Sequence, residues 1–252
     1  EGKDNKWISD FQMPVIKNIK IRKHDVARRP AFTLQEYMIF VRKLRSWIVT
    51  VTTPEKDRWR WKTELYDKRM LYYYVLFLVN TGIRTGSETI GLEWRDIEYE
   101  DGHVFINVLN GKRGGGTCIA MPIVKKSLES WREISNHTKP EDKVFGELHD
   151  QKGVSEKFKK LLTRMLTDLD LLFGREGTKR TFYSFRHTYI SFRLQYGNVD
   201  ILNLAKNCRT SVAKIESNYG HIIMRDVARN LTSRKKARPK RKNGNISNLK
   251  NG

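Results

Sequence analysis

The chain has 252 residues, of which 38% are hydrophobic and 11% aromatic, so it can form one large domain with a core and appendages. Its formal net charge of +21 favours a polyanionic partner. The two cysteines, Cys118 and Cys208, are far apart, which argues against a disulfide framework and fits a reducing, intracellular setting. The six histidines are scattered and suggest no metal site. No apolar run approaches the roughly 18 residues that a membrane span needs.

The first third of the chain is predicted to contain a linker and two helices. Residues 1–30 are basic and irregular, and we interpret them as a linker or the remnant of a preceding module. In "TLQEYMIFVRKLRSWIV", Thr33 and Glu36 have capping-box spacing and apolar residues follow at helical spacing. The polar residues 52–64 interrupt this pattern, and a second helix is expected over about 65–80.

Between about 95 and 122 the hydrophobic period changes. The segment "HVFINVLNGKRGGGTCIAMP" contains two short β-rich runs around a Gly- and Lys-rich turn, which predicts a hairpin. Further helices are expected near 123–134, 154–172, 184–196, 198–206 and 211–219. The expected fold class is therefore mixed α/β, mainly α, with one small antiparallel sheet and no internal repeat.

Two basic residues stand in turns that follow apolar segments. Arg84 lies in "NTGIRTGSETIGLEWRDI", just past the second helix, and Lys112 lies at the predicted hairpin tip in "NGKRGGG". Glycines there allow the tip to move toward a ligand, although the spacing is not that of a P-loop. Taken alone, each residue fits an ordinary exposed turn.

Two further residues lie on predicted helices. Arg186, in "TFYSFRHTYISF", falls among aromatic and small residues, and an arginine that faces a core is costly unless an anion meets it. In "TSVAKIESNYGH", Ser211 can cap a helix on which Val212, Ile215 and Tyr219 share one face. Taken alone, Tyr219 fits a core residue whose hydroxyl reaches the surface.

The four motifs occur in one chain in a fixed order: TG-x-R, a hairpin lysine, a helical Arg-His and a near-terminal Tyr-Gly-His. This set resembles the catalytic domain of the tyrosine recombinases, the phage-integrase family, over about residues 31–222. The resemblance implies a helical bundle with a small antiparallel sheet. Residues 1–30 would then connect to a missing DNA-clamping domain, and residues 223–252 would form a basic C-terminal tail.

The resemblance also implies roles for individual residues. Arg84 and Arg186 match the two catalytic arginines, Lys112 the hairpin lysine and Tyr219 the nucleophile. Glu88 falls where the family often has an acidic residue that supports the first arginine, and His187 is expected to pack or to hydrogen-bond.

Two positions depart from the family pattern. Tyr183 stands where the family usually has His, and the best alignment places Arg209 at the later His or Trp position, with Asn207 as the other candidate. Tyr183 can donate a hydrogen bond, but a phenol with an ordinary pKa near 10 is a poor base at neutral pH. Arg209 can bind a phosphate but cannot accept a proton.

The resemblance implies a site-specific recombinase or integrase that cleaves and rejoins double-stranded DNA through a 3′-phosphotyrosyl link, with no cofactor and no metal. It implies a homotetramer on two duplexes, with accessory DNA-bending proteins as candidate partners. The expected location is the cytoplasm and nucleoid of a prokaryote, or the host cell of a phage.

Three other functions fit part of the sequence. A catalytically impaired DNA-binding protein of the same fold fits the two atypical positions. A type IB topoisomerase-like nicking-closing enzyme would use the same chemistry without a specific site. A general RNA-binding protein fits the charge alone and leaves the ordered motifs unexplained.

Overall fold

The computed structural model describes residues 30–49, 58–109, 111, 114–197 and 199–220, with residues 58–61 described by their backbone alone. The predictions for the N-terminal linker, for Lys112 and for the basic tail therefore lie outside the described residues, apart from Pro30. Within the described residues, no helix combines the length and apolar character needed to cross a bilayer.

The helix α1 (Leu34–Val49) begins with the predicted capping box. The backbone N–H of Thr33 donates to the Glu36 carboxylate at 2.8 Å, and the N–H of Glu36 donates to Oγ1 of Thr33 at 3.2 Å. Phe40 on this helix is fully buried and stacks on Phe185. This apolar contact attaches α1 to the C-terminal half of the chain.

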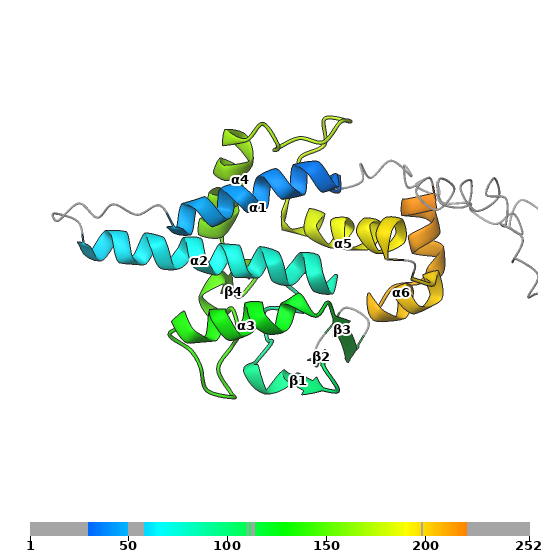
Figure 1. The fold of residues 1–252 in the computed structure, drawn as a ribbon, viewed down its shortest axis with the longest axis horizontal. Helices are drawn as coiled ribbons and strands as arrows, with labels where there is room; N and C mark the ends of the chain where they lie inside the picture. The colour runs from blue at the N-terminus through cyan, green and yellow to red at the C-terminus, as the bar shows by residue number, and fades with distance from the viewer. Residues whose placement is uncertain (1–29, 50–57, 110, 112–113, 198, 221–252) are drawn as a thin grey trace, which may run out of the picture.

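The helix α2 (Arg58–Thr81) is the central element, since it packs against α1, α3, α5 and β3 (Figure 1). It begins earlier than the sequence predicts. Residues 62–69 are exposed or half-buried, and Glu64 and Lys68 form an i,i+4 ion pair of 2.8 Å. The helix thus extends through polar residues before its apolar segment. The spacing of apolar residues could not indicate this extension.

Three antiparallel strands form a sheet in the order β1 (Ile97–Glu100), β2 (His103–Val108) and β3 (Gly116–Ala120). The predicted hairpin is β2–β3, in which Val108 pairs with Gly116. The strand β1 was not predicted; it has only four residues, of which the first alone is buried. The short pair β4 (His149–Asp150) and β5 (Gly153–Val154) was not predicted either.

The remaining helices lie close to their predicted positions. They are α3 (Ile123–Ile134), α4 (Glu156–Asp168), α5 (Phe182–Tyr196), α6 (Ile201–Asn207) and a helix that is described over 212–220. Two short 3-10 helices are η3 (Trp94–Asp96) and η4 (Gly146–Leu148). The predicted cap of the last helix is present, since the N–H of Lys214 donates to Oγ of Ser211 at 3.3 Å. The helix α4 ends before the predicted residue 172, because Asp170 has a left-handed φ of 54°.

Two hydrophobic clusters meet at α5. The larger one fills the space between α1, α2, α3, α4 and the sheet, and the smaller one joins α5, α6 and the helix at 212–220. Cys118 and Cys208 are buried and free, so the chain has no disulfide between them. Gly82, after α2, has a φ of 66°, and a Cβ there would lie 2.3 Å from the Tyr189 ring. Glycine therefore allows the end of α2 to approach α5 closely.

Candidate active site

A buried carboxylate holds two arginines that are 125 positions apart in the sequence. Glu88 lies in the turn after α2, and its side chain accepts the backbone N–H of Arg84 at 2.8 Å as well as an Nη1–H of that residue. Nη2 of Arg209 donates to the same carboxylate at 2.5 Å. Burial alone would raise the pKa of Glu88, but the hydrogen bonds from Arg209 and Arg84 outweigh it and lower the pKa. Glu88 is therefore an ionised carboxylate at neutral pH.

Of the two candidates for the atypical later position, the structure brings Arg209 to the other arginines. Its φ of 48° turns the chain between α6 and the last helix, and its carbonyl accepts Nη2–H of Arg84 at 2.7 Å. Asn207 serves a different contact, because its amide exchanges hydrogen bonds with the backbone of Ile119 in β3 at 2.7 and 3.1 Å. Asn207 thus attaches α6 to the sheet.

Arg186 projects from α5 into the interior and is 3% exposed. Its Nη1–H donates to the carbonyl of Gly82, and its Nη2–H donates to the carbonyl of Cys208 at 2.5 Å. The sequence leads us to expect an anion at this position, whereas these protein partners are neutral carbonyls. Within the described residues no carboxylate forms an ion pair with Arg186, in contrast to Arg84 and Arg209. The two carbonyls orient a guanidinium whose charge they do not neutralise.

Tyr219 lies on the helix at 212–220 and is 5% exposed. Its hydroxyl is hydrogen-bonded to Nδ1 of His187, and the two rings lie 5.6 Å apart between centroids. Tyr183, one helical turn before His187 on α5, meets the same imidazole edge-on with its centroid 5.1 Å away. The side chain of Tyr183 is partly exposed, whereas Arg186 on the same helix is buried. The helix α5 therefore presents Arg186 on one face and the rings of Tyr183 and His187 on a neighbouring face.

A network of neutral groups, which was not predicted from the sequence, fixes the turn that carries Arg84 and Glu88. The buried Tyr74 hydroxyl lies 2.7 Å from Oγ1 of Thr85 and 2.9 Å from Oγ1 of Thr89. Nε2 of His149 lies 3.0 Å from Oγ1 of Thr89, and Nδ1–H of His149 donates to the Phe145 carbonyl at 2.9 Å. Burial lowers the pKa of His149 to about 4 and raises that of Tyr74 to about 12, so both are neutral near pH 7.

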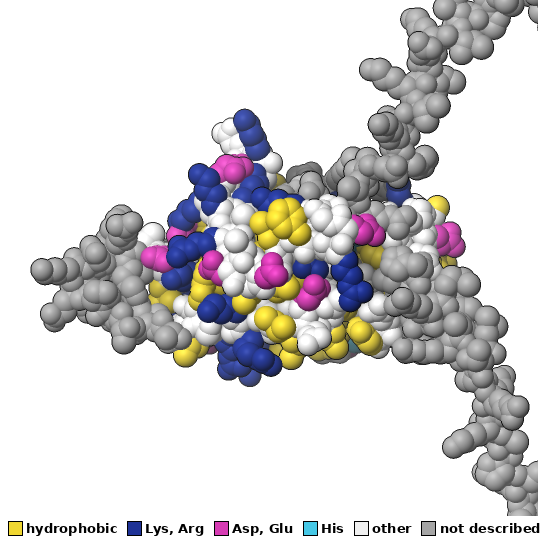
Figure 2. All heavy atoms as spheres, turned by 90° about the horizontal axis from the view of Figure 1, so that it is seen from above, with side chains coloured by type: hydrophobic (Ala, Val, Ile, Leu, Met, Phe, Trp, Pro, Cys, Tyr) yellow, Lys and Arg dark blue, Asp and Glu magenta, His cyan; other side chains and the backbone are white. Residues whose placement is uncertain are grey.

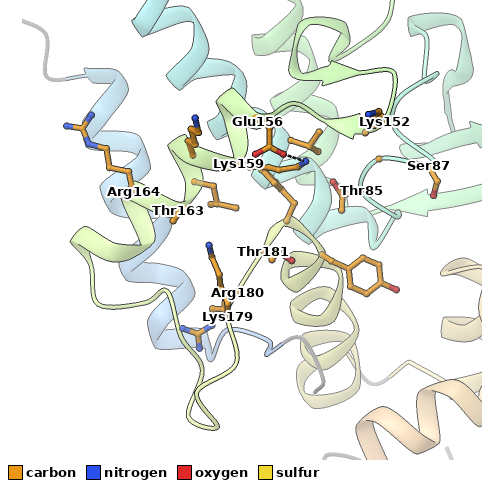
Figure 3. Close-up of a pocket in the computed structure, with 17 residues that line it drawn as sticks. Thr85, Ser87, Lys152, Glu156, Lys159, Thr163, Arg164, Lys179, Arg180 and Thr181 are labelled. Atoms are coloured by element: carbon orange, nitrogen blue, oxygen red, sulfur yellow. Dashed lines mark hydrogen bonds and ion pairs between the residues drawn. The ribbon is translucent and has the colours of Figure 1, made fainter. Parts of the chain in front are cut away.

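A basic cavity of about 910 Å³ lies beside the Arg84 turn and Tyr183 (Figure 3). Its charged lining residues are Lys152, Glu156, Lys159, Lys160, Arg164, Lys179 and Arg180. Glu156 pairs with Lys159 at 2.7 Å, and Arg180 is held by Glu36 at 2.9 Å. Four cations remain outside these pairs, since Lys152, Lys160, Arg164 and Lys179 enter no ion pair among the described residues. Figure 2 shows basic side chains gathered over one half of the visible face, interspersed with acidic ones.

No group of three or more His, Cys, Asp or Glu side chains capable of holding a metal ion occurs among the described residues. The structure thus brings together Arg84, Glu88 and Arg209 in one cluster and Tyr183, His187 and Tyr219 in a second. Arg186 is linked to the first cluster through the carbonyl of Cys208, which directly precedes Arg209, and it is followed on α5 by His187 of the second cluster.

Solved structures with this fold are recombinases and integrases. The XerH site-specific recombinase in a post-cleavage complex with palindromic difH substrate has a TM-score of 0.56 and 16% identity, over 89% of this chain and 61% of that chain. The XerA recombinase has a TM-score of 0.50 and 19% identity, over 89% and 71%. The Tn1549 transposon integrase in complex with circular intermediate DNA has a TM-score of 0.52 and 16% identity, over 83% and 66%. The fold is therefore that of the tyrosine recombinases, as the resemblance implies.

The profile of the phage integrase family matches residues 57–208, which is more than half of the chain. The chain belongs to the phage integrase family. This confirms the resemblance and the fold class that the sequence predicts. No curated protein sequence matches the chain. The chain spans 61% of the length of the XerH chain.

Proposed function

We propose that the chain is a site-specific recombinase that cleaves and rejoins double-stranded DNA through a 3′-phosphotyrosyl intermediate. The observation that carries this proposal is the way one dipeptide orients both arginines. The carbonyl of Cys208 accepts Nη2–H of Arg186, and the next carbonyl, that of Arg209, accepts Nη2–H of Arg84. The helix that bears Tyr219 begins three residues later, at 212. Two guanidinium groups and a tyrosine are thus held by one short segment.

This arrangement suits attack on a phosphodiester. Negative charge grows on the non-bridging oxygens of the phosphate in the transition state, and two guanidinium groups can stabilise it with forked donors. Arg186 supports this role because no carboxylate in the described part of the chain pairs with it, and its two hydrogen-bond partners there are neutral carbonyls. Glu88 orients Arg84 and Arg209, and its negative charge offsets the repulsion between these two cations in a buried site.

The proposed reaction exchanges one phosphodiester bond for another and so conserves the free energy of the bond. The hydroxyl oxygen of Tyr219 forms a bond to phosphorus, and the bond from phosphorus to the 5′-oxygen breaks. The leaving 5′-oxygen takes a proton from a general acid, the role proposed for Lys112, and becomes a hydroxyl. The phosphotyrosine retains the energy needed for rejoining, so no nucleotide cofactor is required. Attack by a 5′-hydroxyl then reverses the step.

The cavity beside the site supports a nucleic-acid partner. Its four cations outside ion pairs match the phosphate backbone of a duplex that continues away from the cleaved bond. We further propose that residues 31–222 form the catalytic domain, that residues 223–252 form a basic tail, and that the complete protein works as a tetramer on two duplexes. Accessory DNA-bending proteins are candidate partners.

The test is to trap the covalent intermediate. The chain is incubated with a pool of nicked duplexes of randomised sequence, from which the short cleaved fragment dissociates, and adducts are recovered and mapped. We expect the DNA on Tyr219, no adduct from Tyr219→Phe, and adducts from Tyr196→Phe, a matched change at an exposed tyrosine of α5. DNA binding without any adduct would favour the impaired DNA-binding protein. Adducts without sequence preference, together with relaxation of supercoiled plasmid, would favour the topoisomerase-like enzyme.

A further inference from the structure

The hydrogen bond between Tyr219 and His187 raises a question that the proposed reaction leaves open. A phenol attacks phosphorus effectively only when it loses its proton, and at neutral pH that proton needs an acceptor in the site. From the sequence, His187 is expected only to pack or to hydrogen-bond, and Tyr183 is a poor base. The acceptor has to be found among groups that lie near the Tyr219 hydroxyl.

Among the residues that the structure describes, the other polar groups of the site are poorly suited to take the proton. Arg84, Arg186 and Arg209 remain protonated in proteins and have no lone pair to offer. Glu88 is ionised, but its two oxygens already accept hydrogen bonds from Arg84 and Arg209. Moving a proton to it would weaken the contacts that orient both arginines. Tyr183 is itself a phenol.

His187 has the geometry and the chemistry of an acceptor. Its Nδ1 already contacts the reacting oxygen of Tyr219. A neutral imidazole that carries its proton on Nε2 offers Nδ1 as an acceptor, and the ordinary pKa of histidine lies near 6.5. The ring of His187 also meets the Tyr183 ring edge-on, and His187 directly follows Arg186 on α5.

We infer that His187 is the general base that takes the proton of Tyr219. The inference rests on the proposed function. As the tyrosine oxygen bonds to phosphorus, its proton moves to Nδ1 of His187, and the imidazole becomes an imidazolium. In the rejoining step the phenolate leaves phosphorus and recovers that proton. His187 thus supplies, from one turn further along α5, a proton acceptor that Tyr183 cannot provide.

A substitution can separate proton transfer from positioning. Asn has an amide near the place of Nδ1, so His187→Asn can keep a hydrogen bond to Tyr219 but cannot take its proton at neutral pH. A duplex recovered from the randomised nicked pool with the wild-type chain serves as the probe. General-base catalysis contributes about 10²–10⁴-fold, so we expect adduct formation by His187→Asn to slow by that factor with DNA binding unchanged. His103→Asn, the same change at an exposed histidine of β2, should react at the wild-type rate.

A second change identifies the proton as the cause. A fluorinated tyrosine that ionises near neutral pH, incorporated at position 219, needs no base. With it, the defect of His187→Asn should shrink to less than tenfold. An unchanged defect, or a wild-type rate for His187→Asn with the ordinary tyrosine, overturns the role of His187 while leaving the phosphotyrosyl reaction intact. If the wild-type chain forms no adduct at all, the proposed function fails, and this inference fails with it.

A spectroscopic measurement tests the inference without activity. The wild-type chain is labelled with ¹⁵N-histidine, and the NMR signal of His187 is identified as the one that is lost in His187→Asn. The chemical shifts of this signal should be those of the tautomer with the proton on Nε2. Tyr219→Phe should shift the Nδ1 resonance of that signal. A proton on Nδ1 at neutral pH, before DNA is added, would rule out this nitrogen as the acceptor.

Discussion

The carboxylate of Glu88 lies 2.5 Å from Nη2 of Arg209, although 121 residues separate the two in the chain. The same carboxylate holds Arg84, so one negative charge orients two cations in the interior. Their mutual repulsion is offset only while Glu88 is ionised. The pair therefore connects the turn after α2 to the segment before the Tyr219 helix.

Removing the charge of Glu88 should damage both the fold and the reaction. Breaking a buried ion pair by removing one partner typically costs about 3–5 kcal/mol, so Glu88→Gln should lower the free energy of unfolding by a value in that range. Adduct formation should fall as well, since both arginines lose their common partner. Chemical denaturation measures the first effect, with Glu100→Gln at an exposed position of β1 as the matched control. Equal stabilities for the two variants would contradict the role of Glu88.

Cleavage should depend on the paired hydrogen-bond donors of the Arg84 and Arg186 guanidinium groups as well as on their positive charge. Arg84→Lys and Arg186→Lys keep one positive charge but cannot donate two parallel hydrogen bonds. We expect adduct formation to fall far more than DNA affinity in both variants. Arg95→Lys, at an exposed site, is the control and should change neither. Losses of equal size in binding and cleavage would mean that these arginines only grip the DNA backbone.

Lys112 is predicted to protonate the leaving 5′-oxygen. Lys112→Ala should slow cleavage by about 10²–10⁴-fold, whereas Lys126→Ala on α3 should not. A substrate with sulfur in place of the bridging 5′-oxygen releases a thiolate, which needs no proton. That substrate should restore the Lys112→Ala rate toward that of the wild type, and it should not restore Tyr219→Phe. A defect that persists with sulfur would place the acid elsewhere, with Tyr183 as the next candidate.

The cations of the basic cavity are predicted to bind phosphates. Lys160→Gln and Lys179→Gln should weaken binding to all duplexes alike. Each phosphate that a variant no longer neutralises should reduce the slope of log affinity against log salt by about 0.9. Binding titrations at several salt concentrations give this slope, and Lys126→Gln is the control. Deletion of residues 234–252 should act in the same way if the tail binds DNA. An unchanged slope would place these residues away from the duplex.

Acid should destabilise the chain through His149. Its folded pKa is about 4 and its ordinary value is 6.5, so between these values the unfolded chain binds a proton that the folded chain does not. Stability is therefore complete above about pH 6.5 and falls as the pH drops toward 4, by about 2–3 kcal/mol. His149→Asn should lose this part of the pH dependence, whereas His103→Asn should keep it. Denaturation curves between pH 7 and 4.5 give the comparison.

Local sequence patterns predicted most of the helices and identified the motifs that contain the candidate site residues. The capping box at Thr33 and Glu36 and the cap at Ser211 form as predicted, since such contacts depend on neighbours in sequence. The strand β1 was missed although the turn at Asp101 and Gly102, with φ of 47° and 77°, carries the Asp-Gly signal of a hairpin.

The long-range contacts of the site could not be predicted in the same way. His149 reaches Thr89 across 60 residues, and no periodicity marks a histidine in a polar segment. The alignment favours Arg209 over Asn207 at the atypical later position, but the contacts that each residue makes depend on tertiary structure. The left-handed backbone of Arg209 directs its side chain back to Glu88, while Asn207 pairs with the edge of β3. The residues that flank Asn207 and Arg209 in the sequence do not indicate these different contacts.

The two consecutive carbonyls of Cys208 and Arg209 couple the orientation of both arginines to the position of one segment. Each carbonyl orients one arginine, and both belong to the segment that leads into the helix of Tyr219. Any movement of this segment that withdraws the tyrosine also releases Arg84 and Arg186 from their carbonyl acceptors. Under the proposed function, a chain whose terminal helix is undocked would be inactive for two reasons, since it would lack the nucleophile Tyr219 and its two arginines would lose the carbonyl contacts that orient them for the phosphate.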